Sequence, residues 1–478
     1  MSTLVFVHGW SVTDTSTYGT LPATLVQRAA QTGSTLRVLD IRLSEYVTFD
    51  DAVTMDDIVR GFDHALRGLD LPDGQFDCVT HSTGGPVVMA WLRAQRMMPK
   101  AYANVKARHV IMLAPAHFGS ALAKLGKGVL GRLKAWFNGI EPGQRILDWL
   151  ELGSPESLSL NLGVVHGADL SSQGTYLFNL IGDRPDRKLY DVINAYTGED
   201  GSDGVVRLAA ANLNVTHLTL TQQAGGPLLT ATTARAPRSA FRLLPGLAHS
   251  GTTQGIMAAQ PPPSITVETI LRCLAVNSAA SYAALCDAFV AENAPRDANK
   301  VELEPAGIFA PRVHIHDPRS LLIVRLRDDR GEVPVNAQFQ LTAGPEASPD
   351  QLPPGFMIDR QANDRDAATW ALFLNHAILA GDAAVPDPRD TSKTLRGPLV
   401  AHSPYGARIQ PADISGLIRH VVANTAQNSD LLTNMRPHET TIIDVVLSRR
   451  VAEGVFRLTD KLTPVEDFRH PTPGPDLL

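Results

Sequence analysis

The chain has 478 residues, of which 44% are hydrophobic and 19% charged, and its formal net charge at pH 7 is −6. With a mean hydropathy of −0.04, these values are typical of a soluble globular protein of about two or three domains. They argue against a nucleic-acid partner, and no apolar run reaches the roughly 18 residues that a membrane span needs. Three cysteines do not suggest a disulfide framework, and without zinc-type ligand spacing we expect no metal.

The first predicted element is a buried strand at residues 3–7, an apolar run that stops at His8-Gly9. A glycine at a strand end lets the next backbone N–H point into a cleft, so we expect the N–H of Trp10 to contribute to an oxyanion hole. The strand leaves no room before it for a signal peptide. We therefore expect a cytoplasmic protein, or one exported without a recognisable N-terminal signal.

Residues 76–85, Phe-Asp-Cys-Val-Thr-His-Ser-Thr-Gly-Gly, form the most informative segment. An apolar strand ends there at Ser82 among small residues, and Pro86 with the apolar residues after it predicts the start of a helix. This strand–turn–helix pattern indicates a nucleophile elbow, although Thr80 occupies the first glycine position of Gly-x-Ser-x-Gly. Ser82 is the candidate nucleophile, and the N–H of Thr83 is the second candidate oxyanion donor.

An insertion at about residues 118–172 is expected to be helical. Its apolar residues fall on one helical face and its lysines on the other, while glycines weaken the helix. The apolar set is Leu122, Leu125, Val129, Leu133 and Trp136, the lysines are Lys124, Lys127 and Lys134, and the glycines are Gly126, Gly128 and Gly131. The segment is either a mobile lid that presents an apolar face to lipid or a cap packed permanently on the core.

Another strand is predicted at residues 176–182, followed by the loop Gly-Ser-Asp-Gly-Val-Val at 201–206. Asp203 lies between small residues, where a carboxylate can accept a hydrogen bond from an imidazole, so it is the candidate acid. Asp183 and Asp200 are rival candidates. A loop at 245–251 contains His249, one of fifteen histidines in the chain and the candidate general base.

Together these pieces resemble the α/β-hydrolase superfamily, and within it the bacterial lipases and esterases. The resemblance covers residues 1–275, through His8-Gly9, residues 81–85, residues 202–206 and His249; residues 114–120 also resemble a lipase segment, in which His117 is interpreted as structural. It implies a mostly parallel sheet with a helical lid. The chain order serine, aspartate, histidine also favours His249 over the remaining histidines.

Such a triad predicts a serine-dependent carboxylic ester hydrolase that works through an acyl-enzyme and needs no cofactor. The expected substrate is a small-molecule or lipid acyl ester, with a lipid–water interface as a possible site of action. A phospholipase or polyester hydrolase would use the same triad. An amidase, a thioesterase or a noncatalytic hydrolase-like binding protein would also be compatible with the sequence.

After residue 290 the pattern changes. A polar segment at 291–312 predicts a linker, and short apolar runs near 320–328, 337–341, 368–372, 440–447 and 454–458 predict separate strands. We therefore expect an α/β-hydrolase domain at 1–290 and a β-rich domain at 313–478, resembling an antiparallel sandwich. No second catalytic constellation is present in this part of the sequence.

Overall fold

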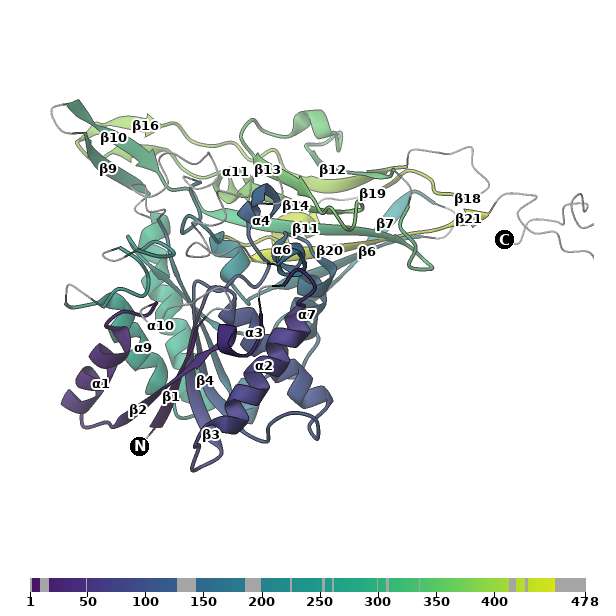
Figure 1. The fold of residues 1–478 in the computed structure, drawn as a ribbon. Coiled ribbons are helices and arrows are strands. Elements are labelled where there is room, and N and C mark those ends of the chain that lie inside the picture. Colours follow the sequence, from purple (N-terminus) through teal and green to yellow (C-terminus); the bar gives the residue numbers. More distant parts are fainter. Residues whose placement is uncertain are drawn as a thin grey trace, which may run out of the picture.

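The computed structural model describes residues 2–8, 17–48, 50–126, 143–184, 199–223, 226–251, 254–259, 262–298, 300–306, 309–334, 336–411, 418–425 and 429–451. Two large sheets dominate this part of the chain (Figure 1). Within these ranges, every helix is too short or too polar to span a bilayer.

The first sheet has six parallel strands in the order β2-β1-β3-β4-β5-β8. They are β2 (Leu36–Arg42), β1 (Ser2–His8), β3 (Gln75–His81), β4 (Lys106–Leu113), β5 (Tyr176–Gly182) and β8 (Ala240–Leu244). All of β5 and all but the first residue of β3 are buried. Because helices cover both faces of this sheet, its central strands are largely apolar in sequence.

Two groups of helices flank this sheet (Figure 1): α1, α9 and α10 lie on one side, and α2, α3 and α7 on the other. Their bounds are α1 (Leu21–Gln31), α2 (Met55–Gly68), α3 (Gly84–Met97), α7 (Pro155–Val165), α9 (Ile265–Leu274) and α10 (Ala279–Ala298). The start of α2 is fixed by a capping box, in which Thr54 and Asp57 exchange hydrogen bonds. Its buried face then packs against α3.

The second sheet has nine strands in the order β12-β17-β19-β7-β6-β20-β11-β14-β13. They are β12 (Gln338–Ala343), β17 (Tyr405–Gln410), β19 (Ala423–Thr425), β7 (Leu228–Arg235), β6 (Thr216–Gln222), β20 (Thr440–Leu447), β11 (Arg319–Asp328), β14 (Thr369–Asn375) and β13 (Met357–Ala362). The predicted fold class, an α/β-hydrolase followed by a β-rich domain, is confirmed.

The smaller elements complete the described β domain. They are the pairs β9 (Val301–Ala306) with β10 (Phe309–Ile315), β15 (Val385–Asp387) with β16 (Asp390–Arg396) and β18 (Ile418–Arg419) with β21 (Arg450–Val451), and the short helices α11 (His376–Ala380) and α12 (Ser429–Asn434). The strand predicted at 454–458 lies outside the described residues.

Three details of the second sheet differ from the sequence-based expectation. The sheet is mixed rather than antiparallel, because β20 enters after a long connection and pairs in parallel with both β6 and β11. The hairpin β6–β7 comes from residues before 290, so the predicted domain boundary does not coincide with the division between the sheets. Residues 291–312 contain the end of α10, all of β9 and the first part of β10 rather than a linker.

The polar character that suggested a linker has a structural explanation. Glu292 of α10 forms ion pairs with Arg242 of β8 and Arg272 of α9. Glu302 of β9 pairs with Arg184 and His316. Charged residues in this segment thus tie the elements together, and a charge-rich sequence does not by itself separate two domains.

The two sheets are packed against one another through β11, whose side chains alternate between two hydrophobic cores. Leu321 and Ile323 belong to the core that contains the first sheet. Leu322 and Val324 belong to a separate core on the other face. The β domain therefore covers the hydrolase domain with one face of its sheet.

The insertion contributes α4 (Ala121–Gly126), α6 (Gln144–Leu150) and α7 to the described structure. In α6 the side chains of Ile146, Leu147, Trp149 and Leu150 are buried, and Lys124 of α4 forms an ion pair with Asp364 of the β domain, at 2.9 Å. These helices are packed elements. Of the predicted lid helix, residues 127–142 lie outside the described residues, so a moving lid stays a prediction.

Candidate functional site

The serine elbow lies at the carboxyl end of β3, where Ser82 has a φ of 54°. A left-handed conformation is strained for a residue other than glycine, and here the Ser82 N–H is held by the backbone oxygen of Leu113, at 2.9 Å. The turn after Ser82 has room only for small residues at positions 84 and 85. A Cβ on Gly85 would lie 2.8 Å from Pro115, and one on Gly84 would lie 3.3 Å from the Cβ of Thr80. Thr80 is therefore accommodated, but tightly.

The structure brings the three predicted triad side chains together. His249 Nε2 lies 3.2 Å from Ser82 Oγ, and His249 Nδ1 lies 2.8 Å from Asp203 Oδ2. A carboxylate only accepts hydrogen bonds, so Nδ1–H donates to Asp203 and Nε2 is left to accept from the serine hydroxyl. His249 and Asp203 are both buried, with exposed fractions of 2% and 0%, and Ser82 is 9% exposed.

The loop around Asp203 fixes its carboxylate by backbone contacts. Oδ1 accepts hydrogen bonds from the N–H groups of Val205 and Val206, at 3.0 and 2.7 Å. The N–H of His249 donates to the backbone oxygen of Asp203, at 3.0 Å. Both loops are thus joined directly, which sets the orientation of the imidazole ring.

The two rival acids bind elsewhere. Asp183 Oδ1 accepts a hydrogen bond from Gly246 N at 2.7 Å and so stabilises the turn before His249. Asp200 binds His316 and Arg319 in the β domain. The geometry therefore favours Asp203.

The predicted oxyanion donors are only partly within the described structure. Thr83 is the N-cap residue of α3, directly after Ser82, and backbone N–H groups at a helix N-terminus favour negative charge. Trp10 lies outside the described residues. The oxyanion role of both residues stays a prediction.

His81 has a structural role that the sequence did not reveal. Its Nε2–H donates to the backbone oxygen of His249 at 3.0 Å, and the two ring centroids are 4.7 Å apart. Burial, assisted by the nearby His249, lowers the pKa of His81 to about 3. A neutral His81 therefore supports His249; the only sequence signal was its position beside Ser82.

His117 likewise fits the structural interpretation. Its Nε2–H donates to Asn179 Oδ1 at 2.9 Å, and its backbone oxygen accepts from Asn161. Burial lowers the pKa of His117 to about 4. Among the described residues, no group of three or more histidine, cysteine, aspartate or glutamate side chains could hold a metal ion.

Because the buried side chains of His81 and His117 are neutral, we expect the folded protein to lose stability in acid. Because the folded-state pKa of His81 is below the ordinary 6.5, its contribution to stability is present above pH 6.5 and is lost as the pH falls towards 3, by up to about 1.4 kcal/mol per pH unit. His81→Gln keeps an N–H donor without this titration. Between pH 6.5 and 4.5 the free energy of unfolding of the variant should fall by roughly 2 kcal/mol less than that of the wild type. Urea unfolding at both pH values measures this.

His64→Gln, the same substitution at an exposed position, is the control. Equal losses of stability in the wild type and in His81→Gln would contradict the prediction.

Comparisons with known proteins show a full-length relative among solved structures. The phospholipase PlaB from Legionella pneumophila is 37% identical, with 99% of each chain covered and a TM-score of 0.83. The same phospholipase in complex with thio-NAD is also 37% identical, with 100% of each chain covered and a TM-score of 0.82. The mature Bacillus licheniformis lipase BlEst2 is 20% identical, over 44% of this chain and 79% of that one, with a TM-score of 0.33. No protein-family model matches the chain, and a search of curated proteins found no match.

Proposed function

Since this chain belongs to the family of the Legionella phospholipase PlaB and is a hydrolase of the lipase and esterase type, we propose that it is a serine-dependent phospholipase. It cleaves a carboxylic ester of a glycerophospholipid and releases a free fatty acid. The proposed activity is narrower than the broad lipase or esterase activity predicted from the sequence. Its chemistry is that of the phospholipase alternative.

One observation carries the proposal: the hydrogen-bonded series from Ser82 through His249 to Asp203, on a strained elbow at the end of a parallel sheet. In the first step His249 Nε2 takes the proton of the serine hydroxyl as Oγ bonds to the ester carbonyl carbon. Asp203 stabilises the imidazolium that forms. The N–H groups of Thr83 and Trp10 are the proposed donors to the oxyanion.

The intermediate then collapses. The bond between the carbonyl carbon and the ester oxygen breaks, His249 donates its proton to the leaving alkoxide, and a lysophospholipid departs. Water, deprotonated by the same histidine, attacks the acyl-enzyme. The acid product leaves, and Ser82 regains its proton.

The test is product analysis on vesicles of diacylphosphatidylcholine and diacylphosphatidylglycerol, with triacylglycerol emulsion and p-nitrophenyl esters as comparison substrates. We expect fatty acid and lysophospholipid to appear in equal amounts at early times, and faster than fatty acid from triacylglycerol. Release of phosphate or of the headgroup would contradict carboxylic ester cleavage. Turnover of p-nitrophenyl esters alone would reduce the proposal to an esterase.

A further inference from the structure

The loop that bears Asp203 ends at an arginine held by the β domain. Arg207 is 1% exposed, and its guanidinium donates to both oxygens of Glu199 at 2.9 Å. One of its NH groups also donates to Asp359 of β13. The Phe373 ring of β14 lies beneath the guanidinium, with its centroid 4.2 Å from Cζ, which is within the range of a cation–π contact.

Arg207 closes the loop that positions the carboxylate of Asp203. Residues 202 and 207 form an isolated β-bridge, and the Leu208 N–H donates to the backbone oxygen of Gly201 at 3.0 Å. Within this closed loop, Asp203 N–H donates to the backbone oxygen of Val206 at 3.1 Å. A displacement of Arg207 would therefore be transmitted to the N–H groups that hold Asp203.

The base of the loop lies directly on the second sheet. Gly201 has a φ of 83°, and a Cβ there would lie 2.5 Å from Cγ of Arg319 and 3.2 Å from Cζ of Phe373. After the loop, a short 3₁₀ helix at residues 208–211 is held by Thr440, whose hydroxyl donates to the backbone oxygen of Ala209 at 2.8 Å. Contacts with the β domain thus lie on both sides of Asp203 in the sequence.

Charge balance makes this contact sensitive to single changes. Burial alone would lower the pKa of Arg207, but Glu199 and Asp359 outweigh it and raise that pKa, so the guanidinium stays charged. Removal of one carboxylate partner leaves part of a buried positive charge uncompensated, which is strongly destabilising. A shift of the Arg207 side chain that relieves this would pull on the backbone of the Asp203 loop.

We propose that Asp359 and Phe373 are positioning residues for the catalytic triad: through Arg207 they hold the Asp203 loop, so that the β domain forms part of the catalytic apparatus. This inference rests on the proposed serine-hydrolase function. Neither residue touches the reacting atoms. Their effect should therefore appear in the rate of the chemical step and not in substrate affinity.

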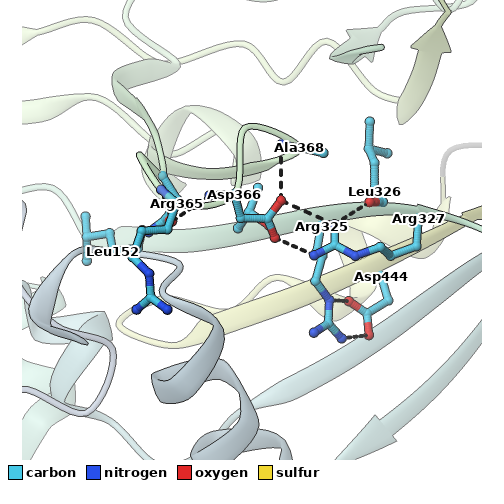
Figure 2. Close-up of polar contacts among 10 residues, drawn as sticks. Leu152, Arg325, Leu326, Arg327, Arg365, Asp366, Ala368 and Asp444 are labelled. Carbon is cyan, nitrogen blue, oxygen red and sulfur yellow. Dashed lines mark hydrogen bonds and ion pairs between the residues drawn. The ribbon is translucent and has the colours of Figure 1, made fainter. Parts of the chain in front are cut away.

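The chain offers a matched control on the same sheet. Figure 2 shows Asp366 paired with Arg327 of β11 and Asp444 paired with Arg325. The Asp366 carboxylate also accepts hydrogen bonds from Thr369 and from the Ala368 N–H. Asp366→Asn thus disrupts an arginine–carboxylate pair of the β domain whose partners lie outside the Asp203 loop.

The experiment compares Asp359→Asn, Phe373→Leu and Asp366→Asn in the full chain. Each rate is divided by the concentration of folded protein, which is determined by circular dichroism. For Asp359→Asn we expect kcat to fall by about 10- to 100-fold with KM within about twofold, and the rate of Ser82 labelling by a fluorophosphonate to fall in parallel. Phe373→Leu keeps an apolar side chain but removes the ring beneath the guanidinium, and its kcat should fall by about 3- to 10-fold. Asp366→Asn should stay within about threefold of the wild type.

Equal losses in Asp359→Asn and Asp366→Asn would overturn the inference, because the effect would then be general destabilisation. So would a wild-type labelling rate in Asp359→Asn. If that variant fails to fold, Phe373→Leu decides alone, by its labelling rate against that of Asp366→Asn. A wild-type protein that is not labelled at Ser82 would instead refute the proposed function itself.

Discussion

Replacement of Ser82 by alanine should lower kcat for phospholipid hydrolysis by at least about 10⁴-fold, because no acyl-enzyme can form without Oγ. Binding residues and oxyanion donors are unchanged in this variant, so KM should move little. Initial rates of fatty-acid release from phosphatidylglycerol vesicles, with the enzyme in excess for the variant, measure the loss.

Ser157→Ala is the matched control. Ser157 of α7 is also a buried serine, and its hydroxyl donates to the backbone oxygen of Ser154, the N-cap residue of that helix. This variant should keep kcat within about threefold of the wild type. A Ser82→Ala protein that retains a tenth or more of the wild-type rate would refute the serine mechanism.

Replacement of Asp203 by asparagine should lower kcat by about 10³- to 10⁴-fold. The Asp203 carboxylate accepts from His249 Nδ1–H and from two backbone N–H groups. An amide cannot accept at both positions, because one of its ends carries two hydrogens. His249 would then favour the tautomer that is protonated at Nε2, which cannot take the proton of Ser82. Steady-state kinetics at pH 8 measure this change.

The control for that variant is Asp183→Asn, since Asp183 was the rival acid and contacts the turn before His249. It should lose less than about tenfold in kcat. If Asp183→Asn were the more damaging of the two, the assignment of the acid would be wrong.

Local patterns predicted the elements that carry the site. The runs at residues 3–7 and 76–81 correspond to β1 and β3, and 176–182 matches β5, because strands buried on both faces are mostly apolar. The turn residues after them marked Ser82 and Asp203. The structure adds the distances that bring His249 to both.

Long-range relationships could not be read from the sequence in the same way. The hairpin β6–β7 has alternating polar residues, as many strand pairs do. Nothing local indicates that β6 pairs with β20 in the second sheet rather than with a strand of the first sheet. The role of Arg207 could not be predicted either, because its partners Asp359 and Phe373 are more than 150 residues away in the sequence. Such contacts depend on how the two sheets pack.

Covalent labelling is the sharpest test of the serine mechanism: the wild-type protein is treated with a fluorophosphonate while hydrolysis of phosphatidylglycerol is followed, and the modified peptide is then identified by mass spectrometry. We expect one phosphonyl group on the peptide of residues 76–85, at Ser82, with loss of phospholipid hydrolysis in proportion to labelling. Modification at a different residue, or full hydrolysis after stoichiometric labelling of Ser82, would contradict this mechanism.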